Sequence, residues 1–190
     1  MKSTLLVELS DEDLIKGCRK KNRMSQEMLY RRYAKELYNL ALIYESDRDN
    51  AKDILQEAFI KIFINIDSFG RKSSLNSWMR KILTNTAIDH YRKSCNEKQF
   101  IPIDNIVHPF SNEESVASIL NTKDIISQVN RLPNGARMIF QLYSIKGYRH
   151  KEIANLLNIS EGTSKSQINR AKKLLQQWIG GNNMKYRIIE

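Results

Sequence analysis

Apolar residues recur every three or four positions along most of this 190-residue chain, and no segment shows the strict alternation of a surface strand. This spacing is typical of amphipathic helices. The first three predicted helices begin at the capping residues Ser10 (paired with Asp13), Ser25 and Asp47, and the first two end near residues 20 and 45. The third carries the most regular apolar stripe, which consists of Ala51, Ile54, Leu55, Ala58, Phe59, Ile62, Phe63 and Ile66.

A fourth helix is predicted from about Leu75 to Lys93, after the polar and basic loop GRKSSLNSW. Its inward residues are expected to be Leu75, Trp78, Met79, Ile82 and Thr86. Lys81, Asn85 and Arg92 fall on an adjoining flank. Because asparagine hydrogen-bonds base edges well, this flank and the loop residues Arg71 and Lys72 are candidates for contact with an unstacked base. Core packing of Trp78 and a local hydrogen bond of Asn85 are the alternatives.

Residues 149–175, RHKEIANLLNISEGTSKSQINRAKKLL, predict a helix, a tight turn and a second helix. Ile153, Leu156 and Leu157 give the first helix an apolar side, and Ala154 is small where helix backbones cross closely. Asn158 tolerates the left-handed turn conformation, and Ser160 is a good N-cap. In the second helix Ile168, Ala171 and Leu175 are expected to face inward, and the opposite side carries Gly162, Ser166, Asn169, Arg170 and Lys173. That side suits a major groove; a hairpin with a merely solvated outer face is the alternative.

Charge favours the nucleic-acid interpretation. Residues 1–70 carry 12 basic and 12 acidic side chains, whereas residues 71–93 carry 6 and 1, and residues 118–179 carry 10 and 3. The net charge of +10 is therefore concentrated in two separate patches. A polyanion that contacts both patches explains this distribution better than a general need for solubility.

Length and composition indicate two small domains. Residues 95–117 contain Pro102 and Pro109, lack helical periodicity and separate strongly periodic segments. We therefore predict an all-α fold of two helical domains, residues 1–94 and 118–179, joined by a flexible linker and followed by a tail at 180–190. The second domain is a helix-turn-helix domain.

Other classes of protein are disfavoured. The short apolar run at the amino terminus is broken by Glu8, and no segment has the length of apolar residues that spans a bilayer, so we expect a cytoplasmic protein. Cys18 and Cys95 lack a CxxC partner, the three histidines are scattered, and no phosphate-binding glycine loop or nucleophile motif occurs. We expect no metal, no cofactor and no catalysis.

The third helix also has an exposed acidic strip in which Asp53, Gln56 and Glu57 lie beside Ile60 at helical spacing. Such a strip suits a basic partner helix. A solvated face is the alternative.

The motifs together resemble a known family. NAKDILQEAF at 50–59 is followed by SWMRKILTNTAIDHYRK at 77–93, LPNGARMIFQLYSIKGYRHKEIA at 132–154 and SEGTSKSQINRAKKLL at 160–175. In this order and on either side of a linker, they look like an extracytoplasmic-function sigma factor, the small two-domain class of bacterial RNA polymerase initiation subunits. The resemblance covers about residues 10–178.

The resemblance implies partners and residue roles. The partners would be promoter DNA, the beta-prime clamp helices and beta flap of RNA polymerase core, and an anti-sigma factor. Asp53, Gln56 and Glu57 match the clamp-binding surface. The module that melts the minus-ten element and captures a flipped base is matched by Arg71, Lys72, Trp78, Lys81, Asn85 and Arg92. The surface that reads the minus-thirty-five element is matched by Arg149, Glu152, Lys165, Ser166, Asn169, Arg170 and Lys173.

Some positions depart from the usual family pattern. Ser164 stands where an apolar residue is general, and His150 where an aromatic residue is common. Gln167 and Asn169 stand where basic or aromatic residues are frequent. These departures concern promoter preference rather than the fold.

Two other functions remain open on the sequence. A response regulator or ligand-sensing repressor also carries a helix-turn-helix, but its receiver would add alternating strands and helices. A recombinase-like enzyme would need a nucleophile, for which Ser73, Ser74 and Tyr91 lie near basic residues.

Overall fold

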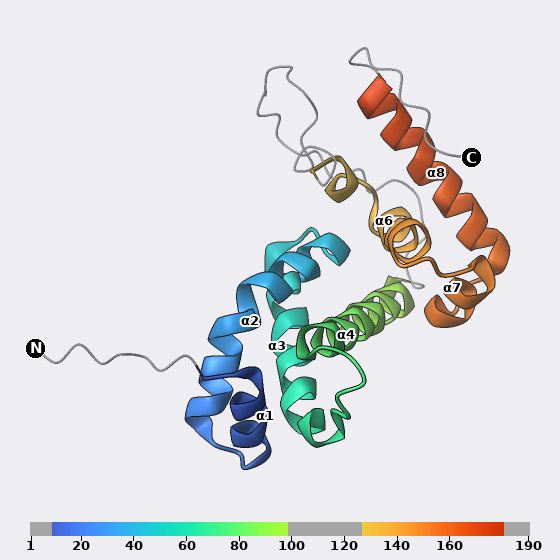
Figure 1. The fold of residues 1–190 in the computed structure, drawn as a ribbon. Helices are drawn as coiled ribbons and strands as arrows, with labels where there is room; N and C mark the ends of the chain where they lie inside the picture. Colours follow the sequence, from blue (N-terminus) through green and yellow to red (C-terminus); the bar gives the residue numbers. More distant parts are fainter. Residues whose placement is uncertain (1–8, 99–126, 181–190) are drawn as a thin grey trace, which may run out of the picture. The chain divides into compact units, whose positions relative to one another are not determined.

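The computed structural model describes residues 9–98 and 127–180, and every regular element within them is helical (Figure 1). The predicted all-α fold is therefore confirmed. The main helices are α1 (Asp11–Arg19), α2 (Arg23–Tyr44), α3 (Arg48–Asn65), α4 (Leu75–Lys98), α6 (Asn134–Phe140), α7 (His150–Leu157) and α8 (Glu161–Gly180). None of the helices in these ranges combines the length and apolar character that crossing a membrane requires.

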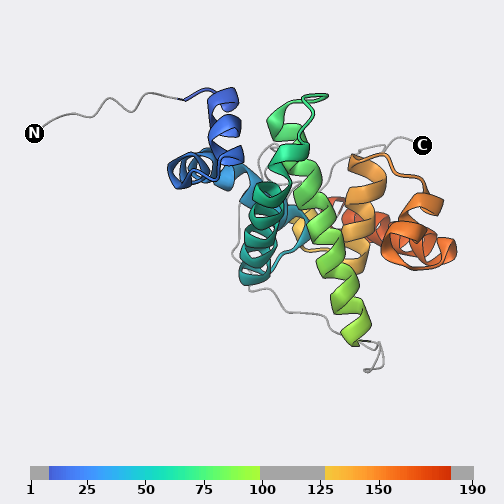
Figure 2. The same ribbon diagram turned by 90° about the horizontal axis from the view of Figure 1, so that it is seen from below.

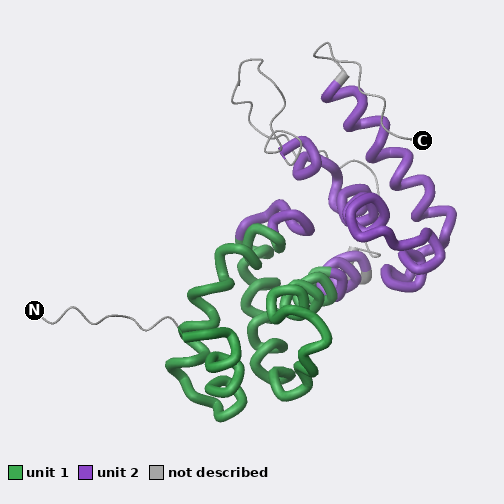
Figure 3. The backbone as a smooth tube through the Cα atoms, viewed as in Figure 1, with its two compact units in different colours: residues 1–41, 49–87 green, residues 42–48, 88–190 purple. Residues whose placement is uncertain are grey.

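The chain divides into two compact units (Figure 3). Unit 1 comprises residues 1–41 and 49–87, and unit 2 comprises residues 42–48 and 88–190. α4 continues unbroken to Lys98 (Figure 2), so residues 95–98 of the predicted linker are helical. Neither glycine nor proline occurs there to end the helix. The rest of the predicted linker, 99–117, and residues 181–190 of the predicted tail lie outside the described residues.

The beginnings of α1 and α2 are fixed by capping side chains. Ser10 caps α1 as predicted, because its Oγ accepts a hydrogen bond from the backbone N–H of Asp13 (3.2 Å). For α2 the predicted cap was wrong. The helix begins at Arg23, and Asn22 Oδ1 accepts the backbone N–H of Ser25 (3.0 Å). Ser25 instead packs against Gly17, where an added Cβ would lie 2.0 Å from its Oγ, so only glycine fits that contact.

The core of unit 1 follows the apolar stripe of α3. All of its predicted members are buried except Phe63, which is half-buried. In α4 the prediction was less accurate. Leu75, Met79 and Thr86 are buried as expected, but Trp78 and Ile82 are only half-buried. Leu83, which is fully buried, takes the central place instead. Residues 75, 79 and 83 form one row at i, i+4 spacing, which turns that row toward the core.

Unit 2 is built around α8. Val129, Leu132 and Ala136 pack against Ala171 and Leu175 of α8 in one apolar cluster. After α6, residues Gln141–Ile145 form a short π-helical turn that leads toward α7. At the rim of the cluster, the Arg131 guanidinium lies 4.8 Å from the centre of the Trp178 ring, a cation–π contact. These contacts fix one face of α8 inside the unit.

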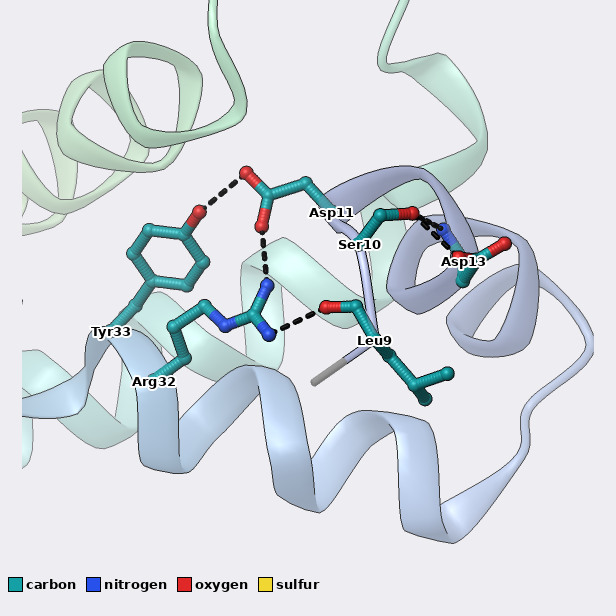
Figure 4. A network of polar contacts seen from close by, with 6 residues as sticks. All are labelled: Leu9, Ser10, Asp11, Asp13, Arg32 and Tyr33. Carbon is teal, nitrogen blue, oxygen red and sulfur yellow. Dashed lines mark hydrogen bonds and ion pairs between the residues drawn. The ribbon is translucent and has the colours of Figure 1, made fainter. Parts of the chain in front are cut away.

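A polar network fastens α1 to α2 in unit 1 (Figure 4). The Asp11 carboxylate accepts hydrogen bonds from Arg32 Nη1 (2.8 Å) and from the Tyr33 hydroxyl (2.6 Å). Arg32 Nη2 also donates to the carbonyl oxygen of Leu9 (2.6 Å). Burial, together with the hydrogen bond to Asp11, raises the pKa of Tyr33 from its ordinary 10.0 to about 12. The neutral phenol is therefore the form that the fold stabilises.

Substitution Tyr33→Phe is expected to lower the free energy of unfolding by about 1 kcal/mol at neutral pH, because a partly buried hydrogen bond is lost. Since the pKa of Tyr33 is raised, the stabilisation that it gives is complete below pH 10 and is lost as the pH rises toward 12. Urea denaturation across this range is the measurement. Tyr38→Phe, on the same helix, is the matched control; an equal effect of both substitutions would contradict the prediction.

Candidate nucleic-acid interface

The predicted helix-turn-helix forms as α7, a tight turn and α8. Asn158 adopts the left-handed conformation with φ of 54°, and its backbone N–H bonds to the carbonyl of Ala154. Ser160 caps α8, because its Oγ accepts the backbone N–H of Thr163 (2.9 Å). Ile153 and Leu157 are buried. The local geometry of the motif therefore agrees with the sequence prediction in turn and cap, and in the core except for Leu156, which is half-buried.

α8 has one buried and one exposed face. Ile168, Ala171 and Leu175 are buried, as predicted. The exposed side chains include all the predicted upstream-reading residues of this helix, Lys165, Ser166, Asn169, Arg170 and Lys173. Because these positions share one side of the helix, the structure brings them together as a single polar and basic surface. An exposed helix face of this composition matches the donors and acceptors of a DNA major groove.

Local bonds orient part of this surface. Lys165 Nζ lies 2.8 Å from Glu161 Oε1, one turn earlier. That hydrogen bond is the main cause of the lowered pKa of Glu161. Ser166 Oγ donates to the carbonyl of Thr163 (2.9 Å). Both side chains are exposed, so a phosphate or base edge would compete with weak, solvent-screened local bonds.

At the start of α7, Arg149 and Glu152 are exposed but differ in function within the fold. Glu152 Oε2 accepts the backbone N–H of Arg149 (2.7 Å), which caps the first turn of α7. Glu152 therefore has a structural role that the sequence prediction did not include. The Arg149 side chain lies on the surface beside that cap. DNA contact by either residue stays a prediction.

The loop before α4 presents Arg71 and Lys72 to solvent. Arg71 has a left-handed backbone with φ of 56°, and its Nη1 lies 3.3 Å from Glu12 Oε1. Trp78 is half-buried, with its ring centre 5.3 Å from that of Phe69. Part of the Trp78 side chain therefore packs against Phe69, as the alternative interpretation of this residue predicts.

Along α4, Lys81 and Asn85 are exposed, as the flank requires. Arg92 differs, because it is half-buried and its Nη1 lies 3.8 Å from Asp89 Oδ1 on the same helix. Its Nε is buried without a hydrogen-bond partner. In this structure, therefore, the exposed part of the flank consists of Lys81 and Asn85, and Arg92 would have to rearrange to contact a ligand.

The outer face of α3 carries the predicted acidic strip. Asp53 and Gln56 are exposed, and Glu57 is half-buried with its Oε1 2.8 Å from Lys61 Nζ. Ile60 is 58% exposed, and Ile64, one turn later, is 73% exposed. Ile64 was not among the predicted members of the strip, although an apolar residue outside the core stripe and four positions after Ile60 is a detectable signal. The strip thus combines carboxylates with an exposed apolar edge, as helix-docking surfaces often do.

The described ranges contain no group of three histidine, cysteine or acidic side chains close enough to hold a metal ion. Cys18 and Cys95 are free thiols. Burial raises the pKa of the Cys18 thiol, which makes it a poor nucleophile.

Comparison with known proteins identifies related sequences for both units. A model of Sigma-70 region 2 matches residues 29–95, and a model of Sigma-70 region 4 matches residues 122–175. The ECF RNA polymerase sigma factor SigM of Bacillus subtilis is 30% identical over 156 residues, which cover 80% of this chain and 94% of that protein. The ECF RNA polymerase sigma-E factor of Escherichia coli K12 is 27% identical over 179 residues, covering 88% and 93%.

Among solved structures, the sigma factor RpoE in complex with the anti-sigma factor NepR, from Bartonella quintana, matches with a TM-score of 0.48 and 24% identity. The match covers 83% of this chain and 98% of that one.

Two residues that the resemblance marks as unusual, Ser164 and His150, contact each other in the structure. His150 Nδ1 lies 2.9 Å from Ser164 Oγ, and Ser164 is fully buried between α7 and α8. The His150 ring also stacks on Tyr143, with ring centres 4.5 Å apart. A polar residue in place of an apolar one is therefore compensated by a hydrogen-bonding ring on the facing helix. The two residues form one contact that joins α7 to α8.

Double-mutant analysis checks this contact. Ser164→Ala is expected to lower the free energy of unfolding of unit 2 by about 1 kcal/mol, because the histidine loses its partner. His150→Phe keeps a ring beside Tyr143 but cannot bond Ser164. In combination the substitutions should cost less than the sum of the single ones, with a coupling of about 1 kcal/mol in urea denaturation. Strictly additive effects would contradict the contact.

Proposed function

The chain belongs to the extracytoplasmic-function sigma factors of the sigma-70 family, and we propose that its exposed surfaces divide the work of promoter recognition among them. A sigma factor directs the initiation of transcription by RNA polymerase, so this chain directs initiation at promoters. The assignment of individual residues to contacts with DNA or polymerase rests on the exposed surfaces of α3, α4 and α8. The observation that carries it is the single polar and basic face of α8 beside the capped start of α7.

The face of α8 reads the upstream, minus-thirty-five element as duplex DNA. Asn169 and Arg170 lie at its centre, with side chains that hydrogen-bond base edges in the major groove. Lys165, Lys173 and Arg149 neutralise phosphates around it, and Ser166 adds a small hydroxyl that lets the helix approach closely. Glu152 supports this surface through its cap on α7, and a base contact of Glu152 is a further part of the proposal.

The loop and the flank of α4 capture the melted minus-ten element. Separating and unstacking a base costs a few kcal/mol, so contacts to the freed strand must offset that cost. Arg71, Lys72 and Lys81 supply positive charge to the strand, and Asn85 offers an amide to a base edge. Trp78 forms the floor beside Phe69. Arg92 contributes only after it leaves Asp89 and the carbonyl of Asn155.

The strip of Asp53, Gln56 and Glu57 on α3 docks on the clamp helices of the beta-prime subunit, with Ile60 beside it. We further propose that the unit containing α8 contacts the beta flap. RNA polymerase core fixes the separation of the two DNA-binding surfaces, which lie on α8 and on the loop and flank of α4. Because linked sites act at a high effective concentration, two weak DNA contacts then give one specific interaction.

The proposed domains are residues 1–94 for core binding and minus-ten recognition, and 118–179 for minus-thirty-five recognition. On this proposal the protein acts in the cytoplasm by binding rather than by catalysis. The surfaces proposed to bind promoter DNA and RNA polymerase core are both exposed, so a protein that covers them would inactivate the sigma factor. We propose an anti-sigma factor as that partner.

Run-off transcription with purified core RNA polymerase tests the function. Addition of the chain is expected to produce defined transcripts from its own promoters, and Asp53→Lys is expected to reduce their yield about tenfold or more, because charge reversal opposes a basic partner helix. Transcript yield against factor concentration is the measurement.

Glu27→Lys is the matched control for this experiment. It reverses a carboxylate of α2 that pairs with Arg31 on the surface and lies outside the α3 strip. Yield that stays normal with Asp53→Lys, or that falls equally with Glu27→Lys, would contradict docking by the strip.

Arg170→Ala is expected to weaken binding of the holoenzyme to the upstream element by about 1–3 kcal/mol if the guanidinium contacts a base. Lys172→Ala removes the same charge from the flank of α8 and should have a smaller effect that does not depend on sequence. Binding to promoter fragments with matched and scrambled upstream elements measures both. A change confined to thermal stability would indicate a packing role instead.

A further inference from the structure

Arg19, at the end of α1, holds the beginning of the loop that precedes α4. Its Nη2 donates to the carbonyl oxygens of Phe69 (3.1 Å) and Asp67 (3.5 Å), and its Nε lies 3.8 Å from Asp67 Oδ1. The bonds join positions 48 and 50 residues apart in sequence. The Arg19 side chain is 36% exposed, so the bond to Phe69 is partly shielded from water. One guanidinium thus holds the backbone carbonyls of residues 67 and 69 in place.

Both ends of the loop at residues 70–74 are fixed. At the beginning, the Phe69 side chain is buried against Trp78 while its carbonyl accepts from Arg19. At the end, Ser74 Oγ accepts the backbone N–H of Ser77 and caps the first turn of α4 (3.2 Å). Between these points residues 70–74 are exposed. The loop therefore presents its central residues from a fixed base.

The helix that supplies Arg19 is itself well anchored. Leu14, Ile15 and Cys18 are buried in unit 1. At the other end of the helix, Asp11 is bonded to Arg32 and Tyr33 of α2 (Figure 4). α1 is therefore a rigid support whose last turn reaches the loop.

A second link from α1 to the loop is weaker. Glu12 lies 3.3 Å from Arg71, but their side chains are 61% and 54% exposed. Exposed ion pairs contribute little, and a phosphate would readily replace Glu12. The Arg19 bonds to backbone carbonyls do not compete with a ligand, because the guanidinium points at the base of the loop rather than at its tip. Arg19 is thus the stronger determinant of loop geometry.

We propose that Arg19 is a positioning residue for promoter opening, which acts by holding the 70–74 loop in the conformation that receives an unstacked base. The proposal rests on the proposed function of that loop. A loop held in its binding conformation loses less conformational freedom when it binds, so affinity and base selectivity both rise. No contact between Arg19 and DNA is required.

The experiment measures binding of the holoenzyme to forked templates made from a promoter that the run-off assay identifies. The single-stranded segment of these templates carries each of the four bases in turn. Arg19→Ala is expected to lower affinity for the preferred template about tenfold, as loss of a charge-assisted hydrogen bond implies, and to flatten the preference among bases. Lys20→Ala removes the same charge from the next position and should keep that preference. Binding to core and to the isolated upstream duplex should be unchanged.

The outcomes separate the two proposals. The loop variant Arg71→Ala/Lys72→Ala tests the function of the loop itself, and forked-template binding as in the unaltered protein would overturn that function. A defective loop variant together with unchanged affinity and preference in Arg19→Ala would overturn only the role of Arg19. If Arg19→Ala does not fold, Arg19→Lys replaces it, since lysine keeps the charge but cannot contact the two carbonyls and the Asp67 carboxylate at once. Full base preference in Arg19→Lys would then overturn the role.

Discussion

Burial of one face of α8 is the constraint on which the proposed DNA recognition by this protein depends. Ala171 and Leu175 pack into the apolar cluster of unit 2, and Ile168 is buried one turn earlier. Because a helix has a fixed angular repeat, burying these residues leaves the orientation of the opposite side with no freedom. Asn169 and Arg170 are exposed as a consequence of packing on the other side of the same helix. On the proposed function, the hydrophobic core of unit 2 therefore determines which side chains of α8 face the promoter.

In unit 1, too, the buried face of a helix determines which side chains lie on its outer face. The buried stripe of α3 determines that Asp53, Gln56 and Ile60 lie on its outer face. Acidic and apolar side chains on α3 suit a protein, whereas the basic loop and flank of α4 suit a nucleic acid. A single small unit thereby offers two chemically distinct surfaces.

The sequence was sufficient where a periodic pattern or a local cap determines the structure. The turn at Asn158, the cap at Ser160 and the stripe of α3 except for Phe63 were predicted correctly. The sequence was insufficient where two nearby residues could each cap the same helix. Asn22 replaced Ser25 as the cap of α2 because Ser25 packs against Gly17. The bond from Arg19 to Phe69 could not be predicted. Every residue has a backbone carbonyl, so the residue type does not indicate which carbonyl accepts, and the two residues are distant along the chain.

The left-handed backbone of Arg71 has a consequence for how the loop can change over evolutionary time. A residue with a Cβ pays about 1 kcal/mol for that conformation, which glycine adopts without strain. The most stable protein would thus carry glycine there and give up a cation. Stability favours glycine at this position and charge favours arginine, so selection for stability alone would remove the side chain that we propose contacts the melted DNA strand.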